Sequence, residues 1–449
     1  VNPPAINHRE RYDLPVYPHL GLGYIASGLV QKGFHELKVI DAKLARKDMD
    51  SSLDELVSFQ PDIVGITAMT HEIIQASRLA DQVKKLLPHC KITIGGVHVS
   101  VLPQQTLEEF PSFDYGIIHE GEKSFPQLAE TIGRKGELDK VPNLVYRHNG
   151  TVHVNPVSDW INELDEIPFP AWNYFPTATE YPVLSARGCP FQCNFCTPNG
   201  RKIRERTPEN VMEEIEWVLS TYKPEQISMY DETFGVNRKR VYKLLDSMMR
   251  HNVPRRVKWF ATTRVNIATE ELLKTMKEAG AFRVGFGVET GNQEILKRSQ
   301  KNIDLKRAEE LVSFAKKCGL KTEVYFILGH PYETLETIND TINFAVQLNG
   351  DLTSFGIMVP YPGTKIYEMA KRGEAGYRLI ARSWNDYNKQ LGNALEFTNI
   401  PRRKIERLQM FAYIKVFLKN RRYLDFLKFC WNFRRQAYGF VEHHFLNKK

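Results

Sequence analysis

Three cysteines within eight residues constrain the fold of this chain more than any other part of its sequence. Cys189, Cys193 and Cys196 have the spacing C-x3-C-x2-C and follow a β-like run over residues 181–186. Structural zinc sites normally have four protein ligands, so a zinc site here would need a distant histidine. A [4Fe–4S] cluster on three cysteines instead leaves one iron open, which can bind another molecule and pass it an electron. The pattern predicts a cluster loop at the carboxyl end of a strand, where barrel enzymes place their active sites.

The length and composition indicate a globular protein of two or three domains. The chain has 449 residues, of which 42% are hydrophobic and 25% charged. No apolar run reaches the roughly 18 residues that a membrane-spanning helix needs. The chain opens at Val1 without a signal-peptide pattern, and we expect a first strand that lacks a few residues. Sparse cysteines favour a reducing cytoplasm, and a net charge of +8 suits an anionic cofactor, substrate or membrane surface.

Residues 1–135 alternate short β-like runs with helical segments. The runs cover residues 37–41, 62–67, 91–96 and 115–118. This alternation predicts a parallel, doubly wound α/β sheet of the Rossmann type, which binds ligands at the carboxyl ends of its strands. Several residues that follow the last three runs are small or glycine and let a ligand approach the backbone. The candidate ligand-binding positions are Thr67, Ala68, Gly95, Gly96, Val97, Glu120 and Gly121.

The remaining residues up to 375 form a linker and a second repeating unit. Residues 136–180 read as the linker, with a hairpin over residues 144–154 and then a Pro-rich extended connector. Residues 181–375 repeat a strand followed by a helix six times, which predicts a partial (β/α)6 barrel. Crossover helices keep the carboxyl ends of parallel strands on one rim. The strand candidates cover residues 181–186, 226–231, 257–264, 282–288, 320–327 and 352–358.

Charged residues follow three strands of this predicted barrel, and each charged group has a structural alternative. Asp231 and Glu232 can accept hydrogen bonds from an ammonium group, or they are a helix N-cap and a solvated carboxylate. Arg264 suits a bidentate bond to a carboxylate, or it forms a rim salt bridge without any ligand. Glu289 follows two glycines and can accept hydrogen bonds from a pair of hydroxyl groups. Glu333, further along, is either part of a ligand site or a helix cap.

In this order the motifs resemble those of the radical S-adenosylmethionine (radical SAM) enzymes. The resemblance rests on C-x3-C-x-aromatic-C, on Gly285-x-Gly287-x-Glu289 and on Gly329-x-Pro331-x-Glu333. It implies that the open iron binds the methionine part of S-adenosylmethionine (SAM). It also implies that the ammonium, carboxylate, ribose and adenine of SAM meet the strand ends in chain order. The implied SAM residues are Asp231, Glu232, Arg264, Gly287, Glu289, Gly329 and Pro331.

Residues 1–135 resemble the cobalamin-binding domain that precedes the barrel in many radical SAM enzymes. The matching pieces include the segments 67–69, 95–98 and 119–122, and the resemblance implies that they face cobalamin. One motif departs from the pattern. Cobalamin domains of the methionine-synthase type carry D-x-H-x-x-G, whose histidine binds cobalt, whereas residues 5–12 lack this motif. We therefore expect base-off cobalamin without a protein histidine. His8 is either a ligand or a solvated loop residue, and a domain that has lost cobalamin is the alternative.

Residues 376–449 are rich in aromatic and basic side chains, with apolar residues at helical spacing. They predict a helical region that either packs on the barrel with a solvated basic face or lies on a membrane surface or an anionic substrate. No nucleic-acid-binding motif or dense basic stripe appears, so nucleic acid is not an expected partner.

The resemblance is closest to the cobalamin-binding radical SAM enzymes of the anaerobic magnesium-protoporphyrin ester cyclase and hopanoid-associated types. It implies reductive cleavage of SAM to a 5′-deoxyadenosyl radical, with an electron donor such as flavodoxin or ferredoxin. The radical would functionalise an unactivated C–H bond of a small-molecule or lipid-like substrate, with methyl transfer from cobalamin as the main hypothesis. The alternatives are a cobalamin-free dehydratase, cyclase or rearrangement enzyme, and a corrinoid or iron–sulfur sensor without turnover. Tyr325 and Tyr361 are the candidate catalytic residues.

Overall fold

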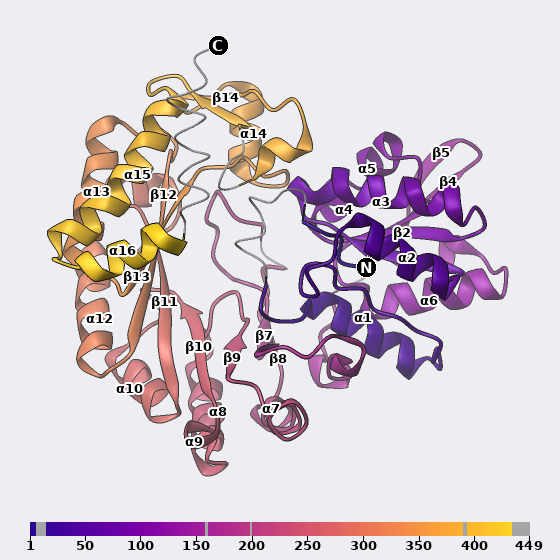
Figure 1. Ribbon diagram of the computed structural model, residues 1–449. Helices are drawn as coiled ribbons and strands as arrows, with labels where there is room; N and C mark the ends of the chain where they lie inside the picture. Colours follow the sequence, from indigo (N-terminus) through magenta and orange to yellow (C-terminus); the bar gives the residue numbers. More distant parts are fainter. Residues whose placement is uncertain (6–14, 158–159, 198–199, 389–392, 433–449) are drawn as a thin grey trace.

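Two α/β units lie side by side in the structure (Figure 1). The structure is a computed structural model, and it describes residues 1–5, 15–157, 160–197, 200–388 and 393–432. One unit is built on a sheet of five strands and the other on a sheet of six. The α/β class predicted from the sequence is confirmed.

The five-stranded sheet combines parallel strands with an antiparallel hairpin. β1 (Ile63–Thr67), β2 (Lys91–Gly95) and β3 (Tyr115–Ile117) pair in parallel, in chain order. β4 (Leu144–His148) pairs antiparallel with β3, and β5 (Thr151–Val154) pairs antiparallel with β4. The hairpin that the sequence predicts after residue 135 therefore extends this sheet.

The strand predicted at residues 37–41 is wrong in its extent. That segment forms a single parallel bridge, between Asn2 and Asp41. Asn2 donates its N–H to the carbonyl of Ile40 at 2.9 Å, and the N–H of Thr67 donates to the carbonyl of Val1 at 3.0 Å. Residues 1–2 thus lie between β1 and this segment. The rest of the segment has no ladder partner among the described residues, so it does not form a strand.

Helices cover both faces of the first sheet. α2 (Met49–Phe59) and α3 (Ile73–Leu86) form one core with the alternate strand residues Val64 and Ile66. Between them, Gly65 lies against the ring of Phe125 in α6 (Gly121–Gly133), which packs on α1 (Leu20–Gln31). Short helices α4 (Val97–Val101) and α5 (Pro103–Glu109) follow β2. Alternate residues of β1 therefore pack against helices on opposite faces of the sheet, as in a doubly wound sheet.

The six-stranded sheet is the predicted partial barrel. All its strands are parallel and neighbour one another in chain order: β6 (Glu180–Val183), β9 (Gln226–Met229), β10 (Lys258–Thr263), β11 (Ala281–Glu289), β12 (Lys321–Leu328) and β13 (Leu352–Ile357). Its edges are β6 and β13, so the barrel stays open. The connecting helices are α7 (Pro208–Tyr222), α8 (Arg238–Arg250), α9 (Val253–Arg256), α10 (Glu270–Glu278), α11 (Gln293–Arg298), α12 (Leu305–Lys317) and α13 (Leu335–Leu348). The longer ones begin after a side chain that accepts a backbone N–H hydrogen bond, as N-caps do. These caps are Thr207, Asn237, Thr269, Asp304 and Thr334.

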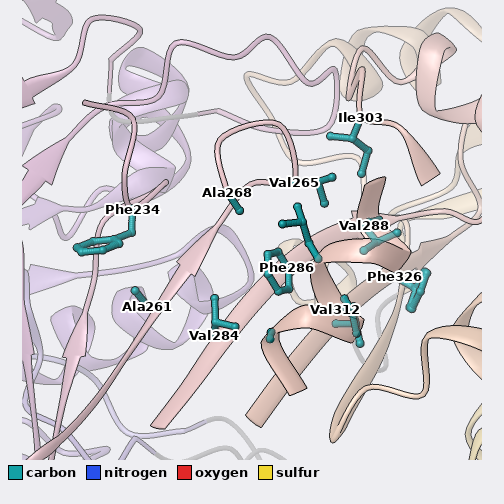
Figure 2. Close-up of a cluster of buried hydrophobic side chains, with 14 of the residues drawn as sticks. Phe234, Ala261, Val265, Ala268, Val284, Phe286, Val288, Ile303, Val312 and Phe326 are labelled. Atoms are coloured by element: carbon teal, nitrogen blue, oxygen red, sulfur yellow. The ribbon is translucent and has the colours of Figure 1, made fainter. Parts of the chain in front are cut away.

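The main hydrophobic core lies between the barrel strands and these helices (Figure 2). Ala261, Val284, Phe286 and Phe326 are all fully buried in it. Tyr325 and Ile327, which alternate with buried residues on β12, are only half-buried. The period of two thus places one row of side chains against the helices and leaves the other row inside the open barrel.

The C-terminal region covers the β13 edge of the barrel. α14 (Lys365–Arg372) leads to a small hairpin of β14 (Tyr377–Leu379) and β15 (Leu395–Phe397), which the sequence did not predict. α15 (Arg402–Lys419) packs on α13 and β13, and α16 (Tyr423–Asn432) follows it. Tyr413 of α15 accepts the N–H of Phe355 at 3.0 Å. The described part of the tail thus contains this strand pair as well as the predicted helices, and α15 covers the β13 edge of the barrel. None of the described helices is long and apolar enough to cross a bilayer.

Candidate active site

The two units meet at the carboxyl ends of their strands. The turn after β3, residues 119–122, forms ion pairs with Arg187. Arg187 belongs to a short antiparallel ribbon of β7 (Ala186–Arg187) and β8 (Arg204–Glu205). In a second contact, Gly363 in the loop after β13 lies against Val101 of the first unit and against Thr197 of the cysteine loop. The strand ends of both sheets therefore border the region that holds the cysteine loop.

The backbone of the cysteine loop is fixed to the barrel. At its start, Gly188 has φ +94°, and a side chain there would collide with the carbonyl oxygen of Lys202. Asn194 donates its N–H to the carbonyl of Ser299 at 3.1 Å and accepts the N–H of Ile366 at 3.2 Å. The loop is thus anchored to the segments that follow β11 and β13.

The three cysteines lie together on this loop. Cys193 is buried, Cys189 is half-buried, and the Cys189 sulfur lies 3.7 Å from the Thr233 hydroxyl. Loss of hydration at the Cys196 thiol, followed by the nearby Cys193 and Cys189 sulfurs, raises its pKa to about 11. No three His, Cys, Asp or Glu side chains in the described ranges lie close enough to share one metal ion. In a [4Fe–4S] cluster each cysteine binds a different iron, so the donor set fits a cluster better than a single zinc.

Arg264 stands at the end of β10, beside these cysteines. Its side chain is buried, and its Nη1 donates a hydrogen bond to the Cys193 sulfur at 3.1 Å. The guanidinium carbon lies 4.0 Å from the centre of the Phe191 ring, which belongs to the cysteine loop. The structure therefore brings this predicted SAM residue into direct contact with the predicted cluster loop.

Asp231 and Glu232 lie at the end of β9 in different surroundings. Asp231 is buried, and its carboxylate accepts the N–H and the hydroxyl of Ser185, both at 2.6 Å, and the N–H of Ala186 at 3.1 Å. Burial raises its pKa, although these hydrogen bonds act to lower it. Both of its oxygens thus tie β9 to the chain just before the cysteine loop. Glu232 is exposed on the rim, and the predicted contact of either carboxylate with SAM stays a prediction.

Glu289 at the end of β11 forms a buried ion pair that the sequence did not reveal. Its Oε1 lies 2.8 Å from Nζ of Lys301, and both side chains are nearly buried. A side chain at Gly287 would come within 2.5 Å of the Glu289 carboxylate and 2.9 Å of Nζ of Lys301, so it would have to displace this ion pair. Glu289 has φ +73° at an irregularity of the ladder, a strained geometry typical of functional positions. Lys301 lies beyond a whole helix from Glu289, and no spacing rule marks it.

The turn after β12 is held by Glu333. The Glu333 carboxylate accepts the N–H of His330 at 3.0 Å and the N–H of Gly329. Gly329 has φ +91°, and a side chain there would come within 2.5 Å of the Phe397 ring. Pro331 is buried in the same turn. Thr334, and not Glu333, caps the following helix α13, so Glu333 shapes the turn that is predicted to meet adenine.

Glu333 also makes a testable prediction about pH. Burial raises its pKa to about 8. Between about pH 4.5 and 8 this carboxyl is protonated in the folded protein but ionised in the unfolded chain. Ionisation favours the unfolded chain, so the free energy of unfolding falls as pH rises through this range, by at most roughly 1.4 kcal/mol per pH unit. Glu333→Gln keeps the acceptor oxygen and removes this titration. In urea titrations, the difference in unfolding free energy, variant minus wild type, is expected to grow from pH 5 to pH 8. A difference that stays constant over this range would contradict a raised pKa of Glu333.

The first unit contains a large cavity between its sheet and the helices α1 and α6. Its volume is about 1050 Å³, and its lining includes both Asp62 and Thr67, so it extends along the whole of β1. Of the residues predicted to face cobalamin, five line it: Thr67, Gly95, Gly96, Glu120 and Gly121. Ala68 is buried outside the lining, and Val97 is 42% exposed. The lining is mostly apolar and runs from Asp62 at the start of β1 to Thr67, Gly95 and Gly96 at the carboxyl ends of the strands. His8 lies outside the described residues.

The side chain of Glu120 serves the contact between the two units. It accepts a hydrogen bond from Arg187 at 3.0 Å, from Arg204 at 2.7 Å and from the N–H of Ile161 at 2.9 Å. Arg187 also pairs with Glu122 at 2.8 Å. Burial acts to raise the pKa of Glu120, but Arg204 and Arg187 together lower it. Sequence reasoning missed Arg187, although its place two residues before Cys189 is the signal that could have marked it.

The two candidate catalytic tyrosines lie in different parts of the site. Tyr325 is half-buried on the inner row of β12, against Gly285. Tyr361 follows β13, and the nearby charge of Glu72 adds to the burial that raises the pKa of its phenol. The structure assigns no catalytic contact to either residue, so both stay predictions.

Two protein-family models match the chain, one on each unit. The radical SAM superfamily model matches residues 183–345, which hold the cysteine loop and the strands from β9 to β12. The B12 binding domain model matches residues 14–129, from the segment before α1 into α6.

Similar proteins share this arrangement. An uncharacterized methyltransferase of Pyrococcus horikoshii is 33% identical over 430 residues, which cover 93% of this chain and 92% of that protein. An anaerobic magnesium-protoporphyrin IX monomethyl ester cyclase of Cereibacter sphaeroides is 27% identical over 78% of this chain, which spans 60% of that protein. The radical SAM methyltransferase TsrM of Kitasatospora setae, solved with cobalamin and a [4Fe–4S] cluster, has the same fold, with a TM-score of 0.69, 18% identity and coverage of 84% and 83%. The chain therefore belongs to the radical SAM superfamily, among the members that carry a B12 binding domain before the barrel.

Proposed function

We propose that this protein is a cobalamin-dependent radical SAM methyltransferase that acts on an unactivated C–H bond of a small-molecule or lipid-like substrate. The ion cluster around Glu120 supports this most directly, because it joins the domain that would hold cobalamin to Arg187, two residues before Cys189. When bound, the cluster and SAM supply an adenosyl radical that removes a hydrogen atom, and cobalamin supplies the methyl group. The residues of the chain bind, orient and shield these groups.

The rim residues would hold SAM against the cluster. Glu289, oriented by Lys301, would accept hydrogen bonds from the ribose hydroxyls. The turn that Glu333 holds would lie beside the adenine. Glu232 is better placed than Asp231 to accept from the ammonium, because both oxygens of Asp231 already bind the chain before the cysteine loop. The cluster ligands would be Cys189, Cys193 and Cys196, which leave the fourth iron for SAM.

Cobalamin would bind at the strand ends of the first unit, with its nucleotide tail in the cavity along β1. Gly95 has open space where a side chain would lie and can let the ligand approach the backbone, whereas Gly96, also in the lining, packs closely against the backbone of Ala68. The sequence lacks the D-x-H-x-x-G motif, so we propose base-off cobalamin without a protein histidine on cobalt. Thr67 would contact the tail from the end of β1.

The corrinoid and iron content decides between this function and its alternatives. Protein prepared without oxygen from cells supplied with hydroxocobalamin is expected to contain about one corrinoid and four irons per chain, the contents of a single cobalamin and a single [4Fe–4S] cluster. Four irons without corrinoid, even after reconstitution, would instead support a cobalamin-free dehydration, cyclisation or rearrangement through the adenosyl radical alone. Both cofactors without 5′-deoxyadenosine formation under strong reductant would support a sensor.

A lipid-like substrate suits an exposed apolar face on α16. The face repeats at helical spacing and is made of Tyr423, Leu424, Leu427 and Trp431, which are 57–75% exposed. Basic side chains accompany it at Lys419 and Lys428. We propose that this face touches anionic membranes, and that a low-potential donor such as flavodoxin or ferredoxin supplies the electron. The double variant Leu424→Glu/Leu427→Glu is expected to lose sedimentation with anionic vesicles, whereas Leu86→Glu, a change at another exposed leucine, is expected to retain it. Equal sedimentation of all three proteins would contradict the proposal.

A further inference from the structure

We infer that Arg264 raises the reduction potential of the cluster held by Cys189, Cys193 and Cys196, because its buried positive charge stabilises the reduced form. This inference rests on the proposed function, since it needs a cluster on these cysteines. It assigns Arg264 a role that is separate from any contact with SAM.

Two contacts with the cysteine loop orient the side chain of Arg264. Nη1 donates to the sulfur of Cys193 at 3.1 Å. The guanidinium lies 4.0 Å above the ring of Phe191, which stands between Cys189 and Cys193 in the sequence. A planar guanidinium stacked on an aromatic ring and bonded at one end keeps a defined orientation.

Arg264 carries a buried charge without an acidic partner. Only 6% of its surface is exposed, and no described carboxylate forms an ion pair with it. Its Nε is also buried without a hydrogen-bond partner among the residues that the structure describes. Lys301, another buried cation of this rim, is paired with Glu289. A buried cation without an anion is costly, and the thiolates of the cluster loop are the negative groups within its reach.

The sign of the effect follows from the charges. An oxidised [4Fe–4S] cluster on three thiolates carries one net negative charge, and it carries two after a low-potential donor gives it one electron. A nearby cation stabilises the doubly charged form more, especially where water is excluded. Hydrogen bonds to cluster sulfurs likewise set the potential of iron–sulfur proteins. Arg264 supplies both the charge and the hydrogen bond, so it favours entry of the electron.

The test is a redox titration of the reconstituted protein without SAM, followed by electron paramagnetic resonance of the reduced cluster. In Arg264→Gln the ratio of reduced to oxidised cluster at a fixed ambient potential is expected to fall about tenfold, which equals about 59 mV for one electron. Arg264→Lys keeps the charge but not the planar guanidinium group. Its ratio of reduced to oxidised cluster is expected to lie between the ratios of the wild type and of Arg264→Gln. Arg283→Gln is the matched control, because Arg283 also stacks on a phenylalanine, Phe260, at 4.1 Å in the same barrel.

The outcomes separate this inference from the proposed function. If Arg264→Gln holds four irons per chain and its reduction potential equals that of the wild type, the inference is overturned. A fall in SAM affinity would not rescue it, because that fall would support only a role of Arg264 in SAM binding. An equal decrease in Arg283→Gln also overturns it. If Arg264→Gln assembles no cluster, Arg264→Met, which has a long side chain without the charge, is titrated in its place: a potential below that of the wild type supports the inference, and a potential equal to the wild type overturns it. A wild-type protein that binds no iron rejects the proposed function, and the inference fails with it.

Discussion

Cys193→Ala is expected to lose the iron–sulfur cluster and all SAM cleavage while the barrel remains folded. Two cysteines cannot hold three irons, and the open iron that binds SAM is then lost. Removal of one buried sulfur costs only about 1–2 kcal/mol of folding free energy. Iron and sulfide content, 5′-deoxyadenosine formation under strong reductant and thermal unfolding measure the three parts of this result.

Cys318→Ala provides the matched control for this variant. It makes the same chemical change in the same barrel, at the end of α12 and away from the rim. It is expected to keep four irons and full SAM cleavage. If Cys193→Ala still cleaved SAM at the wild-type rate, the cluster assignment on this loop would be wrong.

Glu120→Ala is expected to have the largest effect on stability, a loss of about 3–5 kcal/mol, as is typical when one partner of a buried ion pair is removed. The change takes one carboxylate partner from Arg204 and one from Arg187, and both arginine side chains are almost fully buried. Because these bonds join the two units, the first unit is expected to unfold at a lower urea concentration than the barrel. Urea titrations followed by probes placed in each unit measure this separation.

Glu137→Ala tests whether the effect comes from burial. Glu137 also belongs to the first part of the chain and pairs with Lys140, but both side chains are mostly exposed. Exposed ion pairs contribute little, so no change in the urea midpoint is expected. A wild-type midpoint in both units of Glu120→Ala would show that the ion cluster does not hold the units together.

The sequence by itself was sufficient for the order and type of the elements that place the site. Six repeats of strand and helix determine a parallel barrel, because crossover connections put every carboxyl strand end on one rim. The cysteine motif, Arg264 and Glu289 each follow a strand, so the rim location of all three follows from local pattern alone. Gly287 and Gly329 were marked by their motifs, but the reason for glycine at 329, a positive φ and the close Phe397 ring, appears only in the structure.

Only the tertiary structure decided which of these side chains meet. Lys301 finds Glu289 across an intervening helix, Glu120 finds Arg187 across 67 residues, and Asp231 turns to Ser185 and away from the rim. The single bridge at Asp41 and the hairpin of β14 and β15 likewise depend on a neighbour that is remote in the chain. Periodicity reports the burial of one segment at a time. A hydrogen bond or ion pair depends on the distance between two segments, and that distance exists only after the sheets and helices have packed.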